Sequence, residues 1–214
     1  EARIVGQPGH IGHFWANVKR HDPKWQAWAP ALLAREDYRD KCFPIAFHGD
    51  GVPVFKGKSM YIVSVNSILG KGNSMDQKFF QCGYWGRLLN KTKDDKTQDT
   101  EDAVWKYIAL DIDAMWQGTF LGKDANGKTW PKGSQEAKDA SKPLAGGYYC
   151  VPWIFKADLE YIANVLNLEH WGNGTKPCCK CKVNRTDLPW TDYRLLGDNR
   201  VQWLEAEWRA AHTD

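Results

Sequence analysis

The sequence has 214 residues, of which 43% are hydrophobic and 26% charged, a composition typical of a globular protein with one sizeable core or two small ones. No apolar stretch approaches the roughly 20 residues that a membrane-spanning helix needs, so we expect no membrane span. The formal net charge of +3 permits a nucleic-acid partner without demanding one. The 12 tryptophans exceed normal usage, and such residues fill cores more often than they stack on bases.

The N-terminal part of the chain predicts little regular structure. Residues 1–24 are rich in Gly, His and Pro, which favours an irregular lead-in with His10 and His13 as loop residues rather than metal ligands. Residues 24–38 carry apolar side chains at helical spacing, but Pro30 interrupts them. We therefore expect one short helix after this proline.

An apolar run at residues 41–48 leads into the tetrapeptide 48–51, His-Gly-Asp-Gly. This pattern predicts a buried strand that presents Asp50 at its exposed C-terminal end. The flanking glycines lack Cβ and would let backbone, a metal or a phosphate approach the carboxylate. Asp-Gly pairs also mark turns, so a turn at this position stays open.

Residues 60–65 and 79–85 are rich in β-branched and aromatic side chains and predict two further strands of a meander, with residues 52–58 as the first turn. Residues 100–115 predict a helix. On such a helix Asp111 and Asp113 lie about 200° apart, so at most one of them faces any site.

A Gly-, Lys- and Ser-rich excursion at residues 122–147 predicts an insertion or a hairpin around residues 124–127. Residues 148–155 then predict a second strongly apolar strand, followed by Asp158 and a helix over 159–166. Asp158 is thus a second acid at a strand boundary. It is equally well interpreted as the N-cap of the following helix.

A cysteine cluster follows this helix. Cys178 and Cys181 form a CxxC pair, which is half of a tetrahedral zinc site, and His170 and Cys179 are candidates for further ligands. The sequence has no second CxxC, so reduced thiols in a turn remain the alternative.

Taken together, the run 43–54, the segment 158–168 and the segment 170–181 resemble transposon-derived reading frames of algal protists, which are similar to distant relatives of the CACTA and Plavaka transposases. The resemblance covers about residues 40–185 and depends on order and spacing. It implies an α+β fold, with an RNase H-like central sheet, flanking helices and a large insertion at about 86–147. The strand with the first acid would lie beside the strand that precedes the second.

The resemblance also implies the site. Asp50 and Asp158 would be catalytic ligands of Mg²⁺ for phosphodiester cleavage or strand transfer on DNA, Lys56 and Lys58 would face DNA phosphates, and the Cys pair would bind Zn²⁺. The chain has Ala157 where the family usually has Gly. A third acid should lie beyond the cysteine cluster, where the candidates are Asp187, Asp192, Asp198, Glu205, Glu207 and Asp214.

Three readings of function follow. The first is a transposase-derived, metal-dependent enzyme on nucleic acid, and the second is an inactive relic that serves as a structural or binding subunit of a larger protein complex. The third is an unrelated α+β domain. We expect a lead-in at 1–39, a core at 40–185 and a C-terminal tail or helix at 186–214. An active transposase would be nuclear, and a relic would suit an organelle after removal of a targeting segment.

Overall fold

The computed structural model describes residues 6–7, 9–22, 25–55, 58–73, 77–85 and 99–158, with a few more among 161–184. For residues 55, 58 and 99–101 it describes the backbone only. The chain divides into two compact units, Glu1–Lys156 and Ala157–Asp214. Most of the described residues belong to the first unit.

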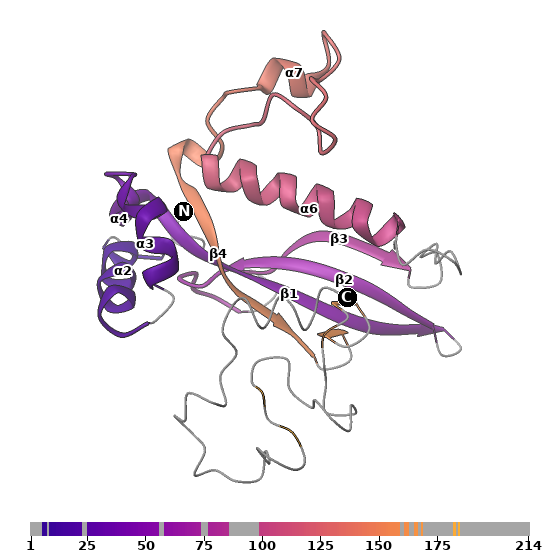
Figure 1. Ribbon diagram of the computed structural model, residues 1–214, viewed down its shortest axis with the longest axis horizontal. Helices are drawn as coiled ribbons and strands as arrows, with labels where there is room; N and C mark the ends of the chain where they lie inside the picture. Colours follow the sequence, from indigo (N-terminus) through magenta and orange to yellow (C-terminus); the bar gives the residue numbers. More distant parts are fainter. Residues whose placement is uncertain are drawn as a thin grey trace. The chain divides into compact units, whose positions relative to one another are not determined.

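A four-stranded sheet forms the centre of the first unit, in the spatial order β3-β2-β1-β4. Its strands are β1 (Cys42–Phe55), β2 (Lys58–Ser67), β3 (Phe79–Trp85) and β4 (Tyr149–Ala157). The pairs β1–β2 and β2–β3 are antiparallel, whereas β1 and β4 run in the same direction in Figure 1, so the sheet is mixed. The predicted α+β class is confirmed, and so are the three adjacent strands of the meander.

The α-helices of the described chain are α2 (His10–His21), α3 (Trp25–Leu33), α4 (Tyr38–Lys41), α6 (Asp99–Gln117) and α7 (Gln135–Asp139), with a 3-10 turn η2 (Ala145–Gly147). Figure 1 shows α2, α3 and α4 grouped where β1 begins, and α6 lying across one face of the sheet. None of these described helices has the length and apolar character needed to cross a membrane.

The irregular lead-in expected over residues 1–24 is wrong, because α2 occupies much of it. Ile11, Trp15 and Val18 recur at helical spacing and are buried, so burial of this apolar stripe stabilises the helix. The prediction of a helix starting after Pro30 is also wrong. α3 begins at Trp25 and runs through the proline.

Aromatic rings fix the N-terminal helices to the sheet. The indole N–H of Trp15 donates a hydrogen bond to the carbonyl oxygen of Cys42, at 2.6 Å, where β1 begins. The ring of Trp15 packs edge-on against Trp153 of β4, with centroids 5.5 Å apart, and against Tyr38 of α4. Several of the unusually numerous tryptophans are therefore core residues, as expected.

The segment between α6 and β4 is an ordered insertion. The predicted hairpin at 124–127 is confirmed: the side chain of Asp124 accepts hydrogen bonds from the backbone N–H groups of Asn126 and Lys128, both at 2.9 Å. Gly127 has φ +77°, a conformation that glycine adopts without strain.

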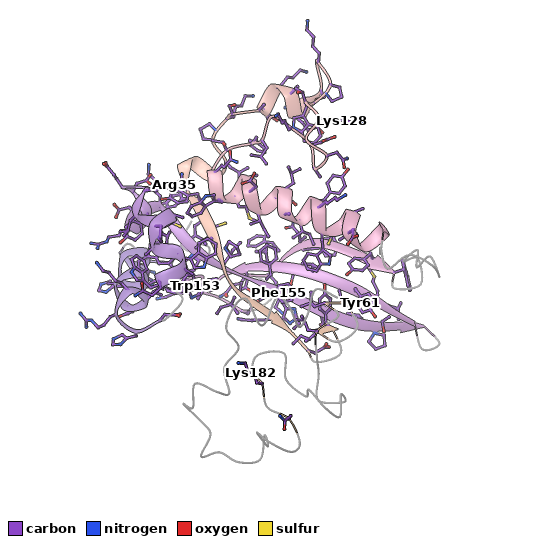
Figure 2. The ribbon with its side chains drawn as sticks, viewed as in Figure 1. Arg35, Tyr61, Lys128, Trp153, Phe155 and Lys182 are labelled. Carbon is purple, nitrogen blue, oxygen red and sulfur yellow. The ribbon has the colours of Figure 1, made fainter. Side chains whose placement is uncertain are left out.

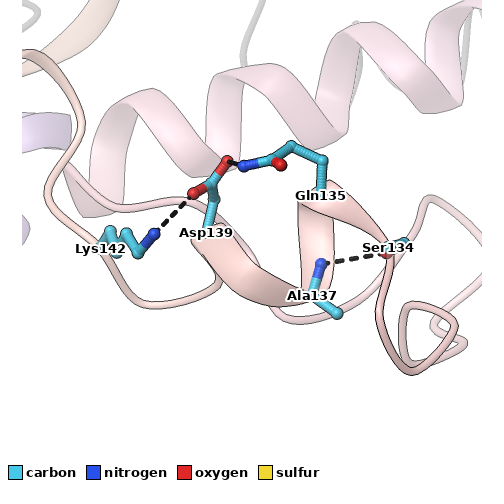
Figure 3. Close-up of polar contacts among 5 residues, drawn as sticks. All are labelled: Ser134, Gln135, Ala137, Asp139 and Lys142. Carbon is cyan, nitrogen blue, oxygen red and sulfur yellow. Dashed lines mark hydrogen bonds and ion pairs between the residues drawn. The ribbon is translucent and has the colours of Figure 1, made fainter.

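Polar contacts fix the rest of the insertion (Figure 3). Ser134 caps α7 by accepting a hydrogen bond from the N–H of Ala137, at 3.1 Å. Asp139 pairs with Lys142 at 2.8 Å and accepts a hydrogen bond from Gln135 at 2.7 Å. These contacts are local in sequence, whereas backbone hydrogen bonds between Phe120 and Ser141 and between Phe120 and Lys142 close the base of the insertion.

Candidate functional site

Asp50 lies inside a strand rather than at its end. β1 continues past Asp50 to Phe55, and Asp50 lies opposite Ile62 of β2. Both interpretations of the tetrapeptide 48–51, an exposed strand end and a turn, are therefore wrong. The antiparallel ladder with β2 continues past a register shift after Pro53 to the pair Phe55–Lys58, which also shortens the turn expected at 52–58.

The two glycines beside Asp50 serve the opposite face of the sheet. Side chains alternate along a strand, so Gly49 and Gly51 present their Cα hydrogens to the face that Asp50 does not occupy. A Cβ at Gly51 would lie 3.6 Å from a ring carbon of Tyr61, its partner across the ladder. This is an ordinary van der Waals distance, so the Tyr61 ring does not require glycine at position 51, and the expected role of the glycines in ligand approach stays a prediction.

The register of the meander defines the surface that carries Asp50, which we name the Asp50 face. Residues directly opposite each other in a ladder share a face. Following the pairs from β1 through β2 to β3, this face comprises His48, Asp50, Val52, Met60, Ile62, Ser64, Phe80, Gly83 and Trp85.

Helix α6 covers the other face. Met115 of α6 lines one cavity together with Ile45 of β1 and Val65 of β2, which belong to the alternate set of side chains. Gln81 of β3 donates a hydrogen bond to Asp111 of α6. The Asp50 face is therefore the face of the sheet that α6 does not contact.

Asp158 directly follows β4 and belongs to the second compact unit. Its carboxylate accepts a hydrogen bond from the N–H of Tyr161 at 2.6 Å, and its carbonyl oxygen accepts one from Ile162 at 3.1 Å. Asp158 thus caps a helical turn, as the N-cap interpretation predicts. Tyr161 and Ile162 are helical, but Val165 and Leu166 form a turn and a bend, so the helix does not extend to 166 as expected. The other positions of the helix expected at 159–166 lie outside the described residues.

The strands associated with the two acids are neighbours, as expected. β1 carries Asp50, and β4, which ends one residue before Asp158, is hydrogen-bonded to β1. A short distance between the two carboxylates stays a prediction, because Asp158 belongs to the other unit.

Most of the remaining candidates from the sequence fall in segments that the structure does not describe. Outside the described residues lie Lys56, His170, Cys178, Cys179, Cys181 and the six acids beyond them, and Lys58 is described by its backbone alone. Within the described ranges, no three histidine, cysteine or carboxylate side chains come close enough to hold one metal ion.

The acids of α6 divide as their spacing predicts. Asp111 contacts Gln81 of the sheet, and burial raises the pKa of its carboxyl, although the hydrogen bond from Gln81 opposes this shift. Both acids are exposed, but Asp113 lies two residues on, about 200° further around the helix and so away from Gln81. Only Asp111 therefore approaches the sheet.

A cavity of about 410 Å³ lies between α6 and the sheet. Its walls are largely apolar, and its polar residues bond to the chain itself: the Asn66 amide donates to the carbonyl of Ser67, and the Ser67 hydroxyl accepts from the N–H of Leu69. Cys150 also lines it, and burial raises the pKa of this thiol to about 12. The cavity presents no group suited to acid–base or metal chemistry at neutral pH.

Sequence reasoning did not select the aromatic residues of the Asp50 face, Phe80 and Trp85. Their positions differ by five, an odd number that in a regular strand places two side chains on opposite faces. A bulge between Val63 and Ser64 in the ladder changes this alternation, so only the observed register brings both onto one face.

Comparison with protein-family models, with curated proteins and with solved structures gave no match to this chain. The functional conclusion therefore depends on the topology and the residues described above.

Proposed function

We propose that this protein has an RNase H-like core of the transposon-derived kind and performs divalent-metal-dependent phosphodiester chemistry on nucleic acid. Asp50 and Asp158 are its catalytic carboxylates in this proposal. The alternative is an inactive relic that binds a larger complex. It would have the same fold but would lack a working catalytic site.

One observation carries the proposal: Asp50 lies on β1, and Asp158 directly follows β4, the strand hydrogen-bonded to β1. The resemblance implies this arrangement, with one acid on the first core strand and another after a later neighbouring strand. The strand order β3-β2-β1-β4, with a helix between β3 and β4, supports the proposal further because it brings segments distant in sequence together.

The chemistry suits carboxylates. Asp50 and Asp158 would supply the hard oxygen ligands that Mg²⁺ prefers. Mg²⁺ held there would supply Lewis-acid chemistry: activation of a water or 3′-hydroxyl for attack on phosphorus, and stabilisation of the charge on the leaving oxygen. Lys56 and Lys58 would neutralise phosphate charge.

The proposal extends to zinc in the second unit. Cys178 and Cys181, with both His170 and Cys179, would supply the four ligands that a tetrahedral Zn²⁺ site needs. Such a site would be structural, because a complete set of protein ligands leaves no open position for a substrate.

The test is metal-dependent cleavage of labelled DNA by the full chain, with Asp50→Asn and Asp158→Asn as the site variants. Each amide keeps the shape of the side chain but removes the charge that holds the cation, so cleavage in Mg²⁺ or Mn²⁺ should be abolished. Asp113→Asn on α6 is the matched control and should cleave normally, since Asp113 is exposed on the helix that covers the opposite face.

A second measurement separates the enzyme from the relic. A metal bound only by the folded state raises the melting temperature, so Mg²⁺ should stabilise the wild-type chain and not the Asp50→Asn variant. A folded chain that neither cleaves DNA nor gains stability from Mg²⁺ or Mn²⁺ would contradict the nuclease and favour the structural subunit.

A further inference from the structure

Three aromatic side chains of the edge strand β3 are exposed: Phe79, which pairs with Val65 on the face that α6 covers, and Phe80 and Trp85, which lie on the Asp50 face. The side chain of Phe80 is 68% exposed and that of Trp85 is 38% exposed. In the described sheet β3 is an outer strand, with β2 on one side. Large exposed rings on one surface often mark a contact site for another molecule.

Phe80 and Trp85 both lie on the Asp50 face. Residues that lie directly opposite one another across β1, β2 and β3 form a row, and each ring belongs to a row next to the row that contains Asp50. The Asp50 row continues through Ile62 to Gly83. Phe80 ends the row that begins at His48. Trp85 ends the row on the other side, so the two aromatic residues flank the Asp50 row at the β3 edge.

Gly83 lies between the two aromatic residues along β3 and lets the Phe80 ring come close to the sheet. A Cβ at Gly83 would lie 3.3 Å from two ring atoms of Phe80 and 2.7 Å from the terminal methyl of Met60. The Phe80 ring therefore lies over Gly83 rather than extending away from the sheet. One side of the ring is supported by the sheet, and the large exposed fraction leaves much of the remainder open to solvent.

We propose that the Asp50 face binds single-stranded nucleic acid, with unpaired bases stacking on Phe80 and Trp85 while the backbone crosses the sheet towards Asp50. This inference rests on the proposed function and names the substrate class of that same site. β1 and β3 are two strand spacings apart, about 10 Å, which corresponds to about three stacked nucleotides.

Unpaired bases fit these rings better than a duplex does. Every base has a π-face that can stack on an aromatic side chain, but in a duplex those faces are already stacked on neighbouring bases. An exposed aromatic pair on a sheet therefore selects bases that are free to be splayed out.

The experiment measures binding of a labelled single strand of about 12 nucleotides to the full chain by fluorescence anisotropy, in EDTA so that no metal contributes. Phe80→Ala and Trp85→Ala should each weaken binding by about fivefold to a hundredfold. Phe80→Tyr and Trp85→Phe should retain most of it, because they keep an aromatic face. Tyr107→Ala is the control, since Tyr107 is 56% exposed on α6, away from this face.

Two further probes isolate stacking from charge. An abasic strand of the same length keeps the phosphates without the bases, so it should bind weakly and be insensitive to Phe80→Ala. The salt dependence of binding should be the same for wild type and Phe80→Ala, because no phosphate contact is removed. Equal affinity for the abasic and normal strands, or for a duplex and a single strand, would overturn the proposal, as would unchanged binding by both alanine variants.

Failure of this inference is distinguishable from failure of the proposed function. In EDTA Asp50→Asn should bind the strand at least as well as wild type, because it loses a negative charge near the phosphates. Base-dependent binding without any Mg²⁺-dependent cleavage removes the nuclease and keeps the stacking surface. If Phe80→Ala and Trp85→Ala leave both cleavage and strand binding unchanged, the stacking surface is removed and the nuclease is kept.

Discussion

The guanidinium of Arg35 lies over the ring of Tyr149, with Cζ 3.5 Å from the ring centroid (Figure 2 labels Arg35). The same guanidinium donates hydrogen bonds to the carbonyl oxygens of Trp116, at 2.5 Å, and Gln117, at 3.4 Å, at the C-terminus of α6. A cation there also complements the helix dipole. One side chain thus joins the N-terminal helices, the end of α6 and the start of β4.

We predict that Arg35→Ala lowers the free energy of unfolding by about 1–3 kcal/mol, from the lost cation–π contact and hydrogen bonds. Arg35→Lys should recover only part of this, because an ammonium cannot reach two carbonyls in a planar fork. Urea denaturation measures both, with Lys106→Ala on exposed α6 surface as the control. Equal stabilities of the Arg35→Ala and Lys106→Ala variants would contradict this role.

The elements that the sequence predicted well are those whose signal is local. Residues 60–65, 79–85 and 148–155 are dense in β-branched and aromatic side chains, and each corresponds to an observed strand. Local pattern sufficed there because β-branched and aromatic side chains favour the extended backbone, even in β3, where none of the side chains is fully buried. The hairpin at 124–127 was equally local, since Asp124 bonds to residues two and four positions ahead.

The errors occurred where tertiary contacts outweighed local preference. α2 has no strong helix signal at its Gly- and His-rich start, but Trp15 reaches Cys42 and Trp153, far along the chain. Asp50 has the neighbours of a turn residue, yet the long ladder with β2 holds it in a strand. The pattern of one sequence does not show which strands pair or in which register. For the same reason it did not identify Phe80 and Trp85 as residues of the Asp50 face.

A second prediction concerns Asp111 and pH. Burial raises the pKa of this carboxyl above its ordinary value of 3.8, so the folded state disfavours the charged form. Its ionisation therefore opposes folding at neutral pH, and this penalty disappears as pH falls below 3.8, where both states are protonated. We expect Asp111→Asn to be more stable than wild type at pH 7, with a difference that shrinks on acidification.

The size of that difference should be small, because the carboxyl is only partly buried and solvent screens its charge. Unfolding curves at several pH values measure it, with Asp113→Asn, two residues along α6, as the control that should show no such trend. If Asp111→Asn were less stable than wild type at pH 7, the hydrogen bond from Gln81 to the charged carboxylate would outweigh the cost of burial, and the prediction would be wrong.

The last prediction uses the cysteines. Thiolates rather than thiols react with iodoacetamide. Burial raises the pKa of both Cys42 and Cys150, and for Cys150 the value of about 12 leaves about one thiol in 10,000 ionised at pH 8. In the native chain both should remain unmodified at pH 8, and Cys82, which is half-buried with a raised pKa, should react slowly. Peptide mapping by mass spectrometry after labelling, with a denatured sample as the reference, measures each site separately.

The same maps test the proposed zinc site. Metal-bound thiolates are shielded from alkylation, so Cys178 and Cys181 should be protected in the native chain and become labelled once a chelator removes zinc. The chelator should also lower the stability of the chain, since binding energy at a structural site is folding energy. Cys42 and Cys150 are internal controls: they should stay unlabelled in chelator if the first unit remains folded. Rapid labelling of Cys178 and Cys181 without chelator would instead identify them as reduced thiols in a turn.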